Sequence, residues 1–113
     1  MTVYRIQSKQ DRTRGAYRSH IYGNDKPYIV KKLEAAHGFD GDRENHPTPD
    51  MDVEIGRCIE RNEYCGFACA TDLLRWFRGF IPDLLRAGYE IVALRDVMIT
   101  AIGEHQVIFT WSD

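Results

Sequence analysis

The stretch of sequence that decides the fold is residues 71–97, which read TDLLRWFRGFIPDLLRAGYEIVALRDV. Thr71 is a candidate N-cap, and the apolar residues after it predict a short helix that Gly79 ends. Pro82 favours the first turn of a second short helix, which Gly88 ends. The Ile- and Val-rich run that follows predicts a strand.

Two more segments are expected to form strands. Residues 105–111 alternate between apolar and polar side chains, and residues 2–7 do the same, as in a half-buried strand. A turn at residues 101–104 would pair the strand over 89–97 with the strand over 105–111 in antiparallel order. The expected fold class is therefore α+β, a small mixed or antiparallel sheet with short helices.

The middle of the chain has a weaker pattern. Turn-forming residues within 21–30 predict a loose hairpin, and residues 31–37 predict a short helix. Residues 38–50 contain two glycines and two prolines and predict a long loop. Asp50 can then cap a short helix over residues 51–59.

Size and composition indicate one folded domain over residues 1–113. The chain is 43% hydrophobic, too apolar for a disordered protein. No apolar run reaches the roughly 18–20 residues that span a bilayer, and the first residues carry no apolar signal stretch. The three cysteines are an odd number, whereas small secreted domains use even disulfide frameworks. We therefore expect a cytoplasmic protein that does not bind membranes.

The net charge of −2 hides a segregation of charge along the chain. Residues 1–32 contain eight Lys or Arg and two acids, a net charge of +6. Residues 33–63 contain nine acids and three Arg, a net charge of −6. This asymmetry indicates two candidate surfaces, one for phosphate groups and one for a basic partner.

The acid-rich residues are the preferred candidates for binding a partner. Closely spaced carboxylates imitate phosphate charge or complement a basic protein surface. Charges at the rim of an interface mainly set encounter rate and specificity, so an apolar anchor is also expected. The candidate partner-binding residues are Phe39, Asp40, Asp42, Glu44, Asp50, Met51, Asp52 and Glu54.

Other segments support weaker alternatives. Residues 4–28 interleave basic residues with tyrosines, which can contact phosphates and bases, but the neighbouring acids make direct nucleic-acid binding less favoured. Cys65 and Cys69 are spaced as C-x3-C, and the four histidines could complete a zinc site. A zinc site usually has two close ligand pairs, so we expect no metal.

Several motifs resemble a group of short proteins of bacteriophages and prophages. They extend along nearly the whole chain and are Tyr4-Arg5, Gly15-Ala16-Tyr17-Arg18, Tyr64-Cys65-Gly66-Phe67, Leu74-Arg75-Trp76-Phe77, Gly88-Tyr89-Glu90 and Gly103-Glu104-His105-Gln106-Val107-Ile108-Phe109. The resemblance implies a phage-encoded protein in the cytoplasm of an infected bacterium. Small phage proteins of this kind include anti-CRISPR and other anti-defence inhibitors.

The order of elements also resembles a reduced ADP-ribosyltransferase fold. That family places Arg or His on its first strand and a catalytic Glu on a late strand, positions that Arg5 and Glu104 take here. The resemblance implies that Tyr4 and Arg5 hold the cofactor NAD and that Arg5 and Glu104 are catalytic. Residues 66–69 lack the Ser-Thr-Ser motif of that family, which favours a fold retained for binding.

Two functions of different classes are therefore expected. The first is a phage-encoded anti-CRISPR protein that uses no cofactor, binds a CRISPR effector complex through its acidic surface and blocks its nucleic acid or nuclease partner. The alternative is an NAD-dependent ADP-ribosyltransferase-like enzyme that modifies a host protein. A third alternative is a structural or regulatory accessory protein of the phage.

Overall fold

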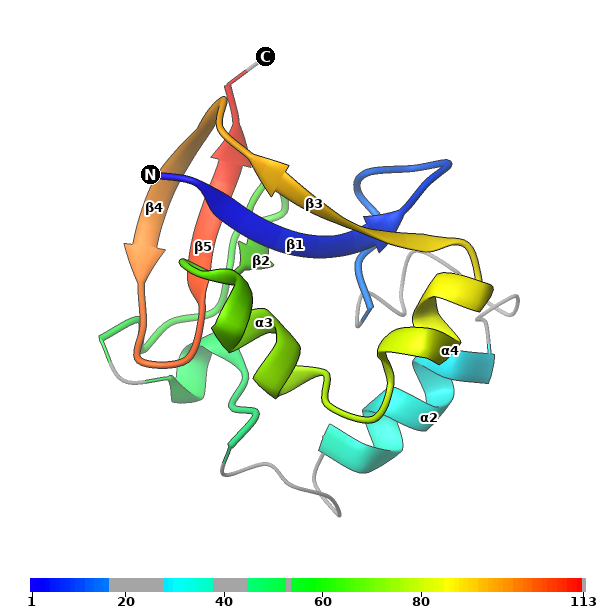
Figure 1. Ribbon diagram of the computed structural model, residues 1–113. Helices are drawn as coiled ribbons and strands as arrows, with labels where there is room; N and C mark the ends of the chain where they lie inside the picture. The colour runs from blue at the N-terminus through cyan, green and yellow to red at the C-terminus, as the bar shows by residue number, and fades with distance from the viewer. Residues whose placement is uncertain (17–27, 38–44, 53, 113) are drawn as a thin grey trace.

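Short helices and two antiparallel sheets make up the computed structural model, which describes residues 1–16, 28–37, 45–52 and 54–112 (Figure 1). The α+β class expected from the sequence is confirmed. The elements are β1 Val3–Ser8, α2 Tyr28–His37, the 3-10 turn η1 Pro49–Met51, β2 Tyr64–Gly66, α3 Ala70–Trp76, α4 Ile81–Arg86, β3 Tyr89–Leu94, β4 Val97–Ile102 and β5 Val107–Trp111. No helix in these ranges is both long enough and apolar enough to cross a bilayer.

A backbone bridge joins the two sheets. β1 pairs with β3, and β5 lies between β2 and β4. Tyr4 and Phe67 exchange two backbone hydrogen bonds of 2.8 Å, which connect β1 to the chain just after β2. The strands therefore follow the order β3-β1-β2-β5-β4, with α2, α3 and α4 below them in Figure 1.

The strand pairing expected for the last third of the chain is wrong. The run expected as one strand over residues 89–97 ends at Leu94, and β4 starts at Val97. β4, rather than β3, pairs with β5, and Gly103 donates its N–H to the Gln106 carbonyl at 2.8 Å in the turn between them. The polar pair Arg95-Asp96 interrupts the apolar run and allows the chain to change sheets.

β1 is buried on both faces, not on one. Ile6 belongs to the core that the helices form with β1 and β3, whereas Val3 packs with Val107 and Phe109 of the other sheet. Because β1 lies between these two clusters, the polar side chains that alternation places with Val3 are also buried, and Arg5 is only 5% exposed.

Two local predictions fail for identifiable reasons. Residues 28–30, expected as a strand, begin α2, because Ile29, Val30 and Leu33 form one buried helical face; residues 21–27 lie outside the described ranges. The helix expected over 51–59 is a single 3-10 turn. Glu54 and Gly56 have φ angles of +75° and +59°, which an α-helix cannot contain.

Candidate functional site

Asp52 connects the acid-rich segment to the turn between β4 and β5 by hydrogen bonds. Its side chain is buried, and its carboxylate accepts hydrogen bonds of 3.2 Å from the backbone N–H groups of His105 and Gln106. The His105 Nδ1 atom lies 3.0 Å from Asp52 Oδ1. A Cβ atom at Gly103 would overlap the Asp52 carboxylate, so this close approach requires glycine.

Glu63 forms a second attachment, to β4. Its carboxylate receives two hydrogen bonds from the Arg57 guanidinium, at 2.8 and 2.9 Å, and one of 2.7 Å from the Glu60 N–H. The Thr100 hydroxyl on β4 also donates to it. The Arg57 hydrogen bonds lower the pKa of Glu63 from 4.5 to about 2, although burial alone would raise it.

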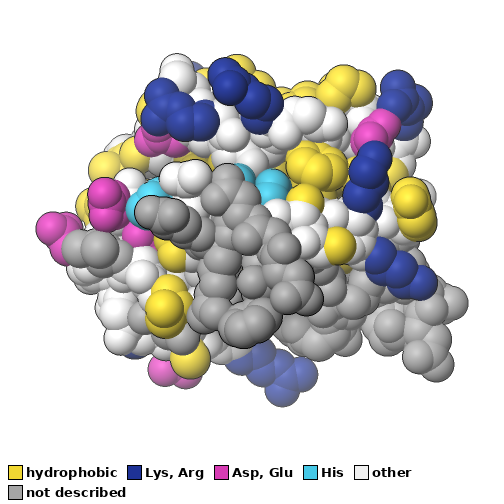
Figure 2. Space-filling view, turned by 90° about the horizontal axis from the view of Figure 1, so that it is seen from below, with side chains coloured by type: hydrophobic (Ala, Val, Ile, Leu, Met, Phe, Trp, Pro, Cys, Tyr) yellow, Lys and Arg dark blue, Asp and Glu magenta, His cyan; other side chains and the backbone are white. Residues whose placement is uncertain are grey.

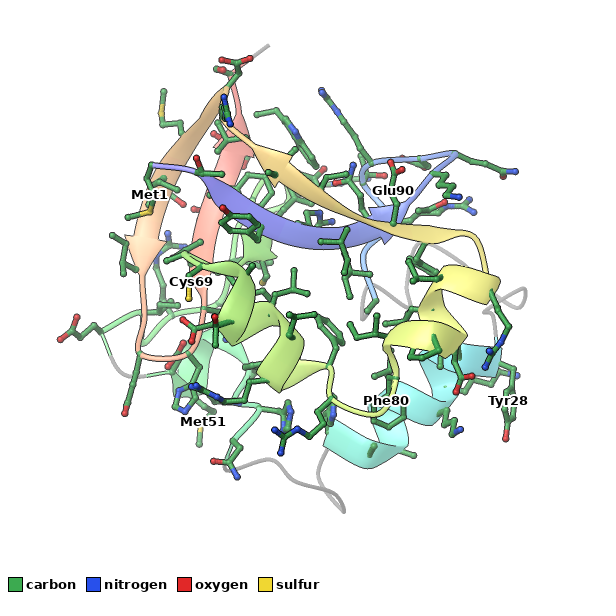
Figure 3. The ribbon with its side chains drawn as sticks, viewed as in Figure 1. Met1, Tyr28, Met51, Cys69, Phe80 and Glu90 are labelled. Atoms are coloured by element: carbon green, nitrogen blue, oxygen red, sulfur yellow. The ribbon has the colours of Figure 1, made fainter. Side chains whose placement is uncertain are left out.

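The residues on either side of Asp52 present an apolar and an acidic side chain to solvent. Met51 is 56% exposed, and it is labelled in Figure 3. Glu54 is also exposed. Of the predicted partner-binding residues, Asp52 lies inside the protein with its carboxylate bonded internally, so it is not part of this exposed surface. Asp50 is the middle residue of η1.

The other predicted partner-binding residues lie outside the described ranges. They are Phe39, Asp40, Asp42 and Glu44.

Arg5 is a structural residue of the interior. Its guanidinium donates to the carbonyl oxygens of Cys65 at 2.7 Å and Arg12 at 3.4 Å, and to the Gln7 side chain at 3.2 Å. Three aromatic rings lie around it, each with its centroid 5.4 to 5.8 Å from Cζ. Arg5 therefore joins β1 to β2. The rings belong to Tyr64, Phe109 and Trp111.

The residues expected for an ADP-ribosyltransferase have different surroundings. Glu104 is exposed in the turn before β5, not on the strand, and lines a different cavity from Arg5. Tyr4 packs against the helical core. The resemblance to the ADP-ribosyltransferase fold is therefore not confirmed.

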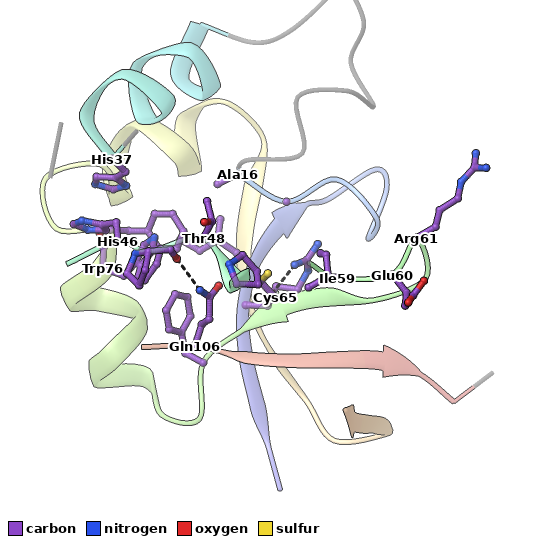
Figure 4. A pocket seen from close by; sticks show the side chains of 17 residues that line it. Ala16, His37, His46, Thr48, Ile59, Glu60, Arg61, Cys65, Trp76 and Gln106 are labelled. Carbon is purple, nitrogen blue, oxygen red and sulfur yellow. Dashed lines mark hydrogen bonds between the residues drawn. The ribbon is translucent and has the colours of Figure 1, made fainter. Parts of the chain in front are cut away.

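A cavity of about 810 Å³ lies among β1, β2, α3 and the chain that precedes η1 (Figure 4). This volume is in the range of small-molecule sites, about 300–1,000 Å³. The walls are largely apolar, with a few polar groups. The lining residues are Arg5, Ile6, Gly15, Ala16, His37, His46, Pro47, Thr48, Pro49, Ile59, Glu60, Arg61, Cys65, Phe67, Trp76, Phe77 and Gln106.

Two stacked histidines form one end of this cavity. The His37 and His46 rings are nearly parallel, with centroids 3.6 Å apart, and the Trp76 ring meets the His46 ring edge-on at 4.8 Å. His46 Nε2 lies 2.8 Å from the Trp76 carbonyl oxygen. A carbonyl only accepts hydrogen bonds, so this nitrogen carries a proton and donates it.

A second cavity, of about 660 Å³, adjoins the first at the histidine pair. His37, His46 and Trp76 line both cavities. The second cavity has a different chemistry, because Arg75, Arg78 and a third histidine line it together with two acids. These last residues are His105, Asp72 and Glu104.

The sequence alone does not predict this cluster of His37, His46 and Trp76. His46 and Trp76 are 30 residues apart, and no motif relates them to His37. From the sequence, the histidines stand out only as candidate zinc ligands. Within the ranges that the structure describes, no three His, Cys, Asp or Glu side chains form a group that could hold a metal ion.

Comparison with known proteins supports the phage resemblance. The family described as "Bacteriophage T4 Y00F protein" matches residues 1–113. No curated protein and no solved structure matches the chain. Because the match covers the whole chain, this protein belongs to the bacteriophage T4 Y00F family.

Proposed function

We propose that this phage protein is an anti-defence protein that acts in the cytoplasm of the infected bacterium by binding, without a cofactor or catalysis. Its partner is a host defence protein or ribonucleoprotein, a CRISPR effector complex, whose nucleic-acid or nuclease partner it blocks. The observation that carries the proposal is an exposed apolar side chain, Met51, on an acid-rich segment that two buried carboxylates hold in place.

The attachments matter because they reduce the entropy lost on binding. Asp52 and Glu63 fix the segment to the β4–β5 pair, so Met51 and Glu54 are held in position before a partner arrives. Met51 supplies an apolar anchor, and Glu54 supplies negative charge beside it. This combination suits the basic surface along which an effector complex holds nucleic acid. The proposal extends to the predicted acids at positions 40, 42 and 44.

The test is inhibition of DNA cleavage by purified CRISPR effector complexes from the phage's host. The double variant Met51→Ser with Glu54→Gln should raise the concentration needed for half-inhibition at least tenfold. Met98→Ser is the matched control, because Met98 is a similarly exposed methionine, 60%, on β4. If the wild type does not inhibit, or if the double variant inhibits like the control, the proposal is wrong.

The enzymatic alternative has its own outcome. An ADP-ribosyltransferase would transfer label from NAD to a host protein, and Glu104→Gln would abolish the transfer. Inhibition that persists in Glu104→Gln without any label transfer agrees with binding alone.

A further inference from the structure

We infer that the two adjoining cavities form one binding site for a nucleoside monophosphate, with the base in the larger cavity and the phosphate in the smaller one. Met51 and Glu54, which carry the proposed function, line neither cavity, so the inference is independent of the proposed function.

The first step is the adjacency of the two cavities. His37, His46 and Trp76 line both, so the stacked histidines stand where the two spaces meet. Figure 4 shows these three side chains at one end of the larger cavity, with Thr48 and Gln106 beside them. A ligand with two chemically different parts could therefore place one part in each cavity.

The larger cavity suits a planar heterocycle. Aromatic rings line it, with the Phe67 and Trp76 centroids 5.4 Å apart, and such rings stack on any base. Gln106 is only 5% exposed, and its amide N–H donates to the Pro47 carbonyl oxygen at 2.8 Å. Among the described residues, nothing donates to the Gln106 Oε1 atom. A base N–H group can donate a hydrogen bond there, which a hydrocarbon cannot do.

The smaller cavity suits one phosphate group. Arg75 forms an ion pair of 3.6 Å with Asp72, whereas the Arg78 guanidinium makes no ion pair with any residue in the described ranges. Arginine recognises phosphate with two parallel hydrogen bonds. Seen from below, the surface in Figure 2 shows histidine side chains, with a group of Lys and Arg side chains at the top of the view.

The acids in the smaller cavity limit the length of the ligand. Asp72 and Glu104 line it beside the arginines, so a second and third phosphate would meet negative charge. A continuous nucleic-acid strand is disfavoured for the same reason. The combination of one stacking cavity and one short cationic cleft therefore points to a mononucleotide.

The experiment is calorimetric titration of the full chain with AMP, GMP, CMP and UMP. Each nucleoside without phosphate, ribose 5-phosphate, NAD and a short oligonucleotide serve as comparisons. At least one monophosphate should bind, at least tenfold more tightly than its nucleoside and than ribose 5-phosphate. The inference is overturned if no monophosphate binds at millimolar concentration, or if NAD or the oligonucleotide binds more tightly than every monophosphate.

Two variants locate the site. Arg78→Gln should weaken the monophosphate to the affinity of its nucleoside, whereas Arg95→Gln, an exposed arginine in the β3–β4 turn, should not change it. Thr48→Phe places a ring in the larger cavity from an exposed position and should weaken nucleoside and nucleotide alike, at least tenfold. Thermal unfolding confirms that each variant is folded. If Arg78→Gln binds like Arg95→Gln, or Thr48→Phe binds like the wild type, the assigned site is wrong.

Discussion

The basic residues 1–32 and the acid-rich residues 33–63 carry opposite charges, yet both use part of that charge to hold the fold together. In the basic part, Arg5 is buried against backbone carbonyls and aromatic rings. In the acid-rich part, Asp52 is buried against backbone N–H groups, and Glu63 is buried against an arginine of the same segment, Arg57.

The difference lies in what stays exposed. Arg5 connects two strands inside the protein and itself presents almost nothing to a partner. Asp52 and Glu63 instead hold a segment whose Met51 and Glu54 remain outside. The net charge of a segment therefore includes buried side chains that cannot contact a partner. For this reason the number of acidic residues in the sequence is larger than the number on the surface.

Substitution of Asp52 should have the largest effect on stability. Asp52→Ala leaves the backbone N–H groups of His105 and Gln106 without their acceptor, and each buried group left unsatisfied costs about 1–3 kcal/mol, so we expect a loss of about 4 kcal/mol. Urea unfolding measures this loss. Asp52→Asn keeps one acceptor oxygen and should lose less; equal losses would show that the hydrogen bonds are not the cause.

Substitution of Arg5 should come next. Arg5→Met leaves the Cys65 carbonyl and the Gln7 amide without their donor and removes a charge held among rings, for a loss of about 3 kcal/mol. Arg5→Lys keeps the charge but lacks the planar fork, so its loss should be intermediate. Urea unfolding of both variants checks this order. If Arg5→Met is as stable as the wild type, the basic part of the chain does not use a buried charge to stabilise the fold as the acid-rich part does.

Glu63 should contribute a smaller, pH-dependent amount. Its pKa of about 2 in the folded protein is below the unfolded value of 4.5, so its contribution is complete above about pH 5 and is lost as the pH falls toward 2. Glu63→Gln should cost about 1–2 kcal/mol at pH 7. The difference between variant and wild type should shrink at pH 3 in urea unfolding. A difference that is equal at pH 7 and pH 3 would contradict the assignment.

The exposed residues of the same segment should matter least for stability. Met51 is more than half exposed and Glu54 is exposed, so Met51→Ser and Glu54→Gln should each change the free energy of unfolding by no more than about 0.5 kcal/mol. The same urea unfolding experiment tests this. A loss as large as that of Glu63→Gln would mean that Met51 or Glu54 also holds the fold, which would remove the distinction between attachment and surface.

The features predicted correctly are those that neighbouring residues decide. The helices α3 and α4 follow from their apolar faces and the glycines after them, and β5 follows from its alternation. The expected N-cap of α3 is wrong, because Thr71 lies inside the helix and Cys69 is the N-cap. The strand predicted at residues 28–30 is wrong because a short apolar run is compatible with either a strand or a helix. Only packing against the core decides between the two. The helix predicted over residues 51–59 is wrong because the chain turns into left-handed backbone conformations after the 3-10 turn at Pro49–Met51. The composition of the segment does not indicate these conformations.

The local sequence was enough to predict the α+β class, the helices α3 and α4, the strand β5 and the segregation of charge, because turns and periodicity act over a few residues. Only the tertiary structure decided which charges are buried. The bond from Gln106 to Asp52 spans 54 residues, and the one from His46 to Trp76 spans 30. Whether a side chain binds a partner or holds the fold depends on such distant contacts, since burial and hydrogen bonding are properties of the packed chain.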